Sequence, residues 1–303
     1  MRNTDTFRQY IWIVNTILRS KKISLDRIQS LWVKDDLNDQ KPLSRTTFYR
    51  LREDILDMFG IQIECDRTDH NQYYINNPET LREHTTQNWM LQTLTVNNIL
   101  VDSLSIKDRL VLEEIPEGLE YLQTIINAIK NNIVLRMTHQ GFDASSPKTN
   151  DIEPYCLKVF RQRWYLLGKK HQNTEGLRIY ALDRIINLEE TKQSFKTDPS
   201  FNAADFFKNY FGVFIGENEQ PVRIVLRAHG KIMISLMKSL PKHPSQKEIA
   251  TEKNYSDFEY FLVPSKDFLH DILKEGDDLE VLEPQSLRNE IKKTLRSSLK
   301  RYQ

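Results

Sequence analysis

The sequence predicts an α+β protein that is built from several domains. Its 303 residues are enough for two or three domains of ordinary size. Apolar residues recur with helical spacing over most of the first 131 positions, and from residue 133 their period changes to two. After Gly216, strand-like and helix-like segments alternate. We therefore expect four regions, at residues 1–77, 78–131, 132–212 and 213–303.

The composition is typical of a globular protein that works in water. Charged residues make up 28% of the chain and hydrophobic ones 39%, and the net charge is only +1. Such a charge creates no global field toward nucleic acid, so any nucleic-acid surface must be local. No apolar run is long enough to span a membrane, and the N-terminus lacks the pattern of a signal peptide. Two cysteines far apart, Cys65 and Cys156, suit a reducing compartment, so we expect a cytoplasmic location.

The motifs that usually carry catalysis or metal binding are absent from the sequence. The seven histidines are scattered without an HExxH spacing, and neither cysteine has a CxxC partner. The chain also lacks a GxxxxGK[ST], a GxGxxG and a GxSxG motif. We therefore expect no metal, no cofactor and no enzymatic activity.

The first region has the element order of a winged helix-turn-helix domain. "DTFRQYIWIVNTILRS" carries one apolar stripe at helical spacing, and Ser24 is a good cap for a second helix, "LDRIQSLWVKD". A third helix is expected between Ser44, as its cap, and Gly60, as its end. Two short alternating strands, "IQIEC" and "QYYIN", follow and are joined by the polar turn "DRTDHN".

The third helix carries the features of a DNA-recognition helix. Its predicted buried stripe consists of Phe48, Leu51, Ile55, Met58 and Phe59. The first half of its remaining surface is basic and rich in hydroxyls, whereas Glu53 and Asp57 follow further along. A recognition helix points its N-terminal residues at the bases, where the helix dipole adds positive potential. The DNA-binding candidates are Arg45, Thr46, Thr47, Tyr49, Arg50 and Arg52. The alternative is a solvated helix in a small three-helix domain.

The connector at residues 78–131 is predicted to be mostly helical. Its two apolar periodic segments, "LREHTTQNWMLQTLTVNNILVDS" and "EGLEYLQTIINAIKNN", are separated by Pro116. The segment could carry a dimer contact, or its helices could pack on their own domain. A dimer is expected in any case if the chain reads DNA, because two-fold regulators bind paired half-sites.

Five short strands follow within about 65 residues, which predicts a small, strongly bent sheet or barrel. On the strand that begins at Arg163, this residue and Tyr165 share one face, while Trp164 and Leu166 share the other. Arginine binds phosphate bidentately, and aromatic rings can stack on bases. The pattern thus allows a pocket for an anion, or a core of aromatic residues with a solvated basic rim.

The motifs "RWYLLG" and "LRIYALDRI" resemble the WYL domain of bacterial transcriptional regulators. "EPYCLKVF", just before them, fits the family's lead-in strand, and the predicted N-terminal winged helix and the ending "GDDLEVLEPQSLRNEI" also fit its domain order. The resemblance implies a small Sm-like β-barrel that senses a ligand, with nucleotides or nucleic-acid fragments as the favoured class. It implies the pocket candidates His139, Tyr155, Arg163, Trp164, Tyr165, Arg178, Asp183 and Arg184.

Two positions depart from the family pattern. His139 stands where many members carry a tyrosine, and Ala181 stands where many carry an arginine. Both departures bear on the identity of the ligand and not on the fold.

The last region, residues 213–303, reads as an α+β module that ends in a basic helix. Residues 285–303 include one acidic residue, Glu290, and six basic ones, namely Arg288, Lys292, Lys293, Arg296, Lys300 and Arg301. A charge run of this kind is usually a solvated face, with nucleic-acid binding as the alternative.

The sequence therefore predicts a cytoplasmic, homodimeric transcriptional regulator. Its winged helix would bind double-stranded promoter DNA, and its barrel would sense an anionic effector, an oligonucleotide or a nucleotide-like molecule. The alternative is a protein-interaction adaptor that docks RNA polymerase or another partner through the winged helix or the barrel.

Overall fold

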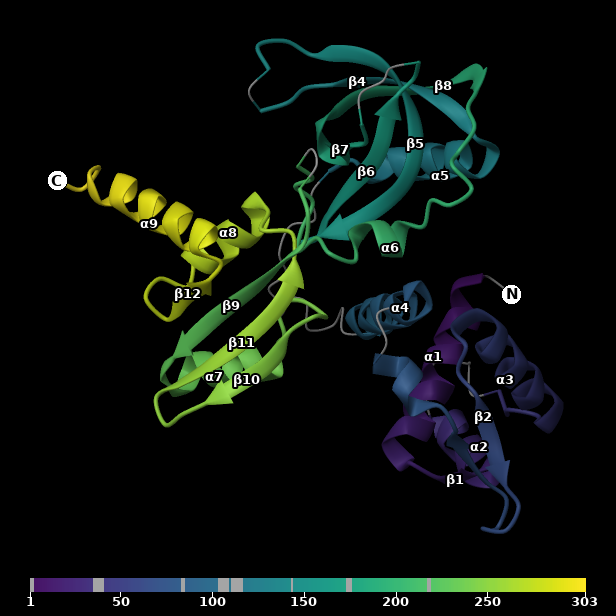
Figure 1. Cartoon of the computed structure of the whole chain (residues 1–303). Helices are drawn as coiled ribbons and strands as arrows, with labels where there is room; N and C mark the ends of the chain where they lie inside the picture. Colours follow the sequence, from purple (N-terminus) through teal and green to yellow (C-terminus); the bar gives the residue numbers. More distant parts are fainter. Residues whose placement is uncertain are drawn as a thin grey trace. The chain divides into compact units, whose positions relative to one another are not determined.

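The computed structural model describes residues 3–34, 41–82, 85–102, 109, 117–142, 144–172, 176–216 and 219–303. The chain divides into two units, Met1–Leu112 and Glu113–Gln303 (Figure 1). The boundaries of the four predicted regions stay predictions. No helix among the described residues is long and apolar enough to cross a membrane.

Three helices form the first part of the N-terminal unit, as predicted. They are α1 (Asn3–Ser20), α2 (Leu25–Lys34) and α3 (Arg45–Phe59). The two serine caps are confirmed, because Ser24 Oγ accepts the amide of Arg27 at 3.3 Å and Ser44 Oγ accepts that of Thr47 at 3.0 Å. Gly60 ends α3 in the left-handed conformation, with φ of 67°.

A three-stranded antiparallel sheet completes this unit. It consists of β1 (Ile23–Ser24), β2 (Ile63–Asp66) and β3 (Gln72–Ile75), in the order β1-β3-β2. The two-residue β1 was not predicted. Three of the predicted stripe residues of α3, Phe48, Leu51 and Ile55, are fully buried in one core with α1 and α2. A 3₁₀ turn (Pro78–Arg82) and α4 (Thr86–Asp102) follow, and α4 contacts α1 and α3. Pro116, the predicted helix break, lies outside the described residues.

The C-terminal unit begins with a five-stranded antiparallel sheet that is covered by one helix. The strands are β4 (Ile133–His139), β5 (Lys148–Phe160), β6 (Arg163–Lys170), β7 (Arg178–Ala181) and β8 (Ile185–Ser194), in the order β7-β6-β5-β4-β8. Helix α5 (Leu122–Asn131) follows a 3₁₀ turn (Leu119–Tyr121) and buries Ile125 and Ala128 against the sheet.

This sheet does not close into the barrel that the sequence predicts. β7 and β8 are its two edge strands, and no ladder joins them among the described residues. The reason is a 3₁₀ turn, Leu182–Arg184, which follows β7 directly and interrupts the extended backbone before β8 begins. Because only these three residues separate the two edge strands, the sheet must curl until its edges approach each other. We call this place, where the turn bridges the open edges, the seam.

The second sheet of this unit has the topology of a split βαβ fold. Its strands are β9 (Val222–His229), β10 (Lys247–Thr251), β11 (Tyr255–Leu262) and β12 (Leu279–Glu283), in the order β10-β11-β9-β12. Helices α7 (Gly230–Ser239), α8 (Lys266–Leu273) and α9 (Gln285–Leu299) contribute to its core. A short helix, α6 (Ala203–Phe207), lies on the connection from the first sheet. The predicted α+β class is confirmed.

Candidate functional site

The seam of the first sheet gathers four of the predicted pocket residues from three elements. Arg163 opens β6, His139 ends β4, and Asp183 and Arg184 belong to the 3₁₀ turn. The Arg163 guanidinium donates two hydrogen bonds to the Asp183 carboxylate, at 2.8 Å from Nε and 2.5 Å from Nη2. This bidentate pair raises the pKa of Arg163 and fixes the plane of its side chain. Asp183 thus orients one arginine beside a second, Arg184.

An aromatic residue that the sequence did not single out lies against both arginines. The guanidinium of Arg184 lies 2.9 Å from the ring centre of Phe142, and that of Arg163 lies 5.9 Å from it. Phe142 is 83% exposed, so most of its surface stays accessible beside the two arginines. The signal that could have revealed it is the aromatic residue directly after Gly141, at the end of the predicted strand and beyond the end of β4. The seam therefore offers two cations and one accessible ring face.

His139 lies on the inner side of this cluster. Its ring meets that of Tyr180 edge to face, with 5.6 Å between the ring centres. Burial and then the positive charge of Arg184 lower its pKa, so the neutral imidazole is favoured in the folded protein. Its Nε2 is buried without a hydrogen-bond partner among the described residues. A histidine at this position thus places a neutral, polar ring beside Arg184.

The other predicted pocket residues have different surroundings. Trp164 packs against the buried core of the sheet with Leu166, and Tyr165 lies beside Arg163, with 5.7 Å between its ring centre and the guanidinium. Tyr155 contacts Phe195 and Phe201 instead of the seam. Arg178 lies at the opposite end of β7, where it pairs with Gly168 in the ladder. The structure thus brings Arg163, Asp183, Arg184 and His139 together and leaves Tyr155 and Arg178 apart from them.

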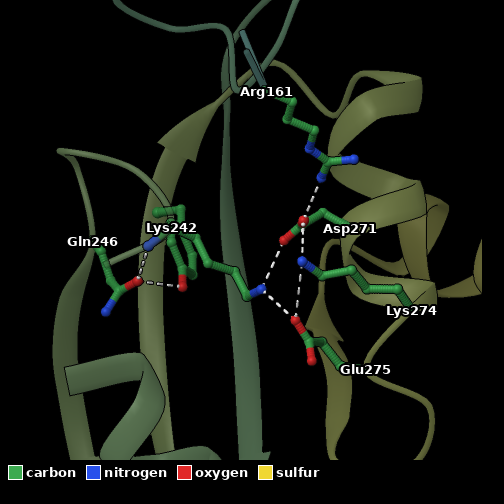
Figure 2. A network of polar contacts seen from close by, with 7 residues as sticks. Arg161, Lys242, Gln246, Asp271, Lys274 and Glu275 are labelled. Atoms are coloured by element: carbon green, nitrogen blue, oxygen red, sulfur yellow. Dashed lines mark hydrogen bonds and ion pairs between the residues drawn. The ribbon is translucent and has the colours of Figure 1, made fainter. Parts of the chain in front are cut away.

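The tight turn before Arg163 connects the first sheet to the second. Arg161 and Gln162 form a two-residue turn between β5 and β6, both with positive φ, at 50° and 62°. Figure 2 shows Arg161 reaching from this turn to Asp271 of α8, with 2.7 Å between Nη2 and Oδ1. Two arginines two positions apart thus bind different partners, because Arg161 binds Asp271 and Arg163 binds Asp183.

Asp271 is the buried centre of a larger polar network. Its side chain is only 4% exposed and also binds Lys242 at 2.7 Å and Lys274 at 2.9 Å (Figure 2). Burial alone would raise the pKa of Asp271, but the hydrogen bonds from Lys242 and Lys274 outweigh it and the pKa is lowered. Lys242, itself 10% exposed, also binds Glu275 at 2.8 Å. The network fastens the turn, α8 and the loop after α7 to one another.

In the N-terminal unit, a groove of about 640 Å³ lies between α3 and the β2–β3 hairpin. Three of the DNA-binding candidates line it, namely Arg45, Tyr49 and Arg52, together with Arg67 of the hairpin. The ring of Tyr49 lies under the Arg52 guanidinium at 5.4 Å, and its hydroxyl lies 3.3 Å from that of Tyr73. These contacts place the Arg52 guanidinium over Tyr49, whose hydroxyl meets β3 at Tyr73.

The remaining candidates on α3 lie outside this groove. The hydroxyl of Thr47 lies 2.8 Å from that of Ser44 and therefore belongs to the helix cap. Thr46 and Arg50 are exposed. Arg50 lies near Tyr10, where its charge opposes the burial and the Asp54 hydrogen bond that together raise the pKa of Tyr10 to about 12. Within the described ranges, no three histidine, cysteine, aspartate or glutamate side chains gather as they would around a metal ion.

The comparison with protein families identifies the domain that contains the seam. Residues 120–190 match the family model of the WYL domain. This chain contains a WYL domain. The match runs from α5 to β8 and includes every residue of the seam. The resemblance predicted from the sequence is confirmed here, and the WYL domain includes α5, which precedes the five strands.

Two solved structures are similar to the chain at low sequence identity. One is proteasome accessory factor B/C (PafBC) of Arthrobacter aurescens, with 14% identity, a TM-score of 0.35, and coverage of 95% of this chain and 46% of that one. The other is described as a CRISPR Cas-related protein, with 11% identity, a TM-score of 0.42, and coverage of 99% and 85%. The chain thus spans less than half the length of PafBC. No curated protein matches the sequence.

Proposed function

We propose that this chain is a DNA-binding transcriptional regulator whose WYL domain senses an anionic ligand, an oligonucleotide or a nucleotide. The observation that carries the proposal is the seam, where Arg163 and Arg184 flank the exposed ring of Phe142. Guanidinium groups suit phosphate oxygens, and an accessible aromatic face suits a base. The WYL match supports a regulatory role for this domain.

The DNA-binding part of the proposal rests on the N-terminal unit. Its three helices and hairpin have the order of a winged helix-turn-helix, with α3 as the recognition helix and β2–β3 as the wing. The basic side chains of the groove, Arg45, Arg52 and Arg67, lie where α3 and the wing would face DNA. The protein would act as a cytoplasmic homodimer on paired half-sites of promoter DNA, without catalysing a reaction.

In the same proposal, the five curled strands are an Sm-like sheet whose seam receives the ligand. An anion there would meet Arg184 and Arg163 together, while the neutral His139 ring offers one further polar atom. The partly open Arg163–Asp183 pair keeps the arginine oriented before the ligand arrives, which lowers the ordering cost of binding.

The ligand claim is tested with short single-stranded DNA and RNA oligonucleotides in a salt series. Arg184→Ala is expected to weaken binding by about tenfold or more, because a charge-assisted contact is lost. Arg178→Ala is the matched control, since this arginine lies at the far end of β7, away from the turn that carries Arg184. Fluorescence anisotropy with labelled oligonucleotides gives the affinities, and thermal unfolding checks that both variants fold.

Two outcomes would contradict the seam as the binding site. One is equal binding by the wild type and Arg184→Ala, and the other is loss of binding in Arg178→Ala alone. Binding of a free mononucleotide, but of no oligonucleotide, would narrow the ligand class and leave the site unchanged.

The DNA claim is tested after selecting a bound sequence from random duplexes with the wild-type protein. Arg45→Ala and Arg50→Ala are each expected to weaken binding by about 1–3 kcal/mol if the side chain contacts a base. Loss of a phosphate contact would instead reduce the salt dependence. Arg19→Ala, at the end of α1, is the control variant. Unchanged affinity in both α3 variants would remove α3 as the recognition helix and favour the adaptor alternative.

A further inference from the structure

Helix α9 begins inside the second core of the C-terminal unit and ends outside it. Leu287 is buried and Ile291 packs against the same core, whereas Leu295 and Leu299 are 51% and 58% exposed. These four residues follow one another at a spacing of four, so they form one apolar line along the helix. The second half of this line is therefore about half exposed.

A groove of about 570 Å³ runs beside the exposed half of this line. One wall is α9, and the other is made by the edge strand β12, the end of β9 and the turn before β12. The residues of the α9 wall are Arg288, Ile291, Lys292, Leu295, Arg296 and Leu299. The apolar line is therefore one side of a hollow that could receive a further element, and not a flat exposed surface.

A basic line accompanies the apolar line. Arg288, Lys292, Arg296 and Lys300 each follow a residue of the apolar line by one position, so they lie about 100° around the helix. Arg288 is engaged at the inner end, because it binds Glu280 at 2.8 Å and the carbonyl of Val281 at 2.6 Å. Lys292 and Arg296 have no acidic partner in the part of the chain that the structure describes. The α9 wall of the groove is therefore positively charged at its outer end, and the opposite wall carries Asp277 in the turn before β12.

We propose that this groove binds an acidic amphipathic helix of another protein. A helix recognises a groove through apolar residues at spacings of three and four, which matches the spacing of Ile291, Leu295 and Leu299. Acidic residues flanking that line would pair with Lys292 and Arg296, as charged flanks do between paired helices. This surface involves neither the seam nor α3, so the proposal stands independently of the proposed function.

The chemistry of the groove disfavours two other occupants. A second copy of α9 would bring the same basic line against this one, and like charges in close apposition weaken an interface. Nucleic acid would use the lysines and arginines but would leave Leu295 and Leu299 without apolar contacts. A partner that is apolar on one face and acidic beside it would contact both the apolar line and the basic line of α9.

The test uses a labelled synthetic peptide of three heptads with leucine at positions a and d and glutamate at e and g. Its glutamates keep it from pairing with itself at neutral pH. The full-length protein is expected to bind it saturably, and Leu295→Ser is expected to weaken binding by about tenfold or more. Lys292→Glu should have a similar effect, and the same peptide with lysine at e and g should not bind.

The control variant is Leu236→Ser, which changes another exposed leucine, 40% accessible, on helix α7. Because Leu295 and Leu236 are both exposed, neither change should alter the thermal unfolding of the protein. Equal binding of the acidic and the basic peptide, or equal binding by wild type and Leu295→Ser, would overturn the proposal. So would sedimentation data in which the protein self-associates and Leu295→Ser abolishes the self-association, since a second copy would then be the occupant.

Discussion

Two arginines at one tight turn, one in the turn and one directly after it, are held by two aspartates in very different surroundings. Arg163 binds Asp183, and the two side chains are 24% and 21% exposed. Arg161 binds Asp271, whose side chain is 4% exposed and has two lysines as further partners. The first pair lies at the seam beside Phe142, and the second lies in a network that is closed to water around its acid.

The difference separates a structural ion pair from one that remains accessible. A buried acid such as Asp271 must keep cations beside it, because an unpaired charge in this place is costly. Asp183 is reached by water and has only to orient one arginine, so a solute anion can approach that arginine. Burial of the carboxylate, and not the number of arginines nearby, therefore marks which end of the turn is open for binding.

The largest effect is expected from Asp271→Asn. This change removes the negative charge from between Lys242, Lys274 and Arg161 while it nearly keeps the shape of the side chain. Because Lys242 would stay buried with only Glu275 to balance it, the free energy of unfolding should fall by about 3–5 kcal/mol. Chemical denaturation of both proteins measures the loss. Lys274→Ala, at an exposed lysine, should cost under about 1 kcal/mol, and equal losses in the two variants would contradict the comparison.

A smaller effect is expected from Asp183→Asn. The Arg163–Asp183 pair is bidentate but partly exposed, so its loss should lower the free energy of unfolding by only about 1 kcal/mol. The same denaturation experiment gives the value. A loss as large as that of Asp271→Asn would mean that the Arg163–Asp183 pair is as inaccessible to water as the network around Asp271, and the two pairs would not differ as proposed.

The smallest effect is expected from the titration of His139. Its pKa is lowered in the folded protein from 6.5, so the unfolded chain takes up the proton first as the pH falls. The stability that the neutral ring contributes is therefore present above about pH 6.5 and is lost below it. Thermal unfolding between pH 8 and pH 5 should show a decline that is weaker in His139→Asn. The pKa of His243 is lowered as well, so the variant is compared with the wild type at each pH. Identical profiles of the two proteins would show that His139 does not contribute to the pH dependence of stability.

Most elements of the fold could be predicted because their signals are local. Ser44 and Gly60 mark the ends of α3, and the switch from helical to alternating periodicity marks β4 onward. β1 was missed because a strand of two residues has no period. The barrel was predicted from five short strands, but the closure of a sheet depends on ladder pairing between its edges, which no periodicity encodes.

The candidate site was predicted only in part, and local geometry explains the differences. A β-bulge between Pro154 and Cys156 shifts the alternation of β5, and Tyr155 packs against Phe195 and Phe201. Phe142 lies after a strand end, where the alternation rule no longer applies. The role of Asp271 was invisible in the sequence because its partners Lys242 and Arg161 come from distant parts of the chain. The DNA-binding and ligand-binding residues themselves stay predictions.

The turn at Arg161 and Gln162 also limits how the length of this chain can vary. Phe160 and Arg163 face each other across the two turn residues, which fixes the register of β5 and β6. One inserted residue would shift that register and turn the side chains of β6 to opposite faces. Arg163 would then point away from Asp183, and Trp164 would point away from the core. Arg161 would no longer be aimed at Asp271. A substitution at this hairpin changes one contact at a time, whereas a single insertion would break both the Arg163–Asp183 pair at the seam and the Arg161–Asp271 pair between the two sheets.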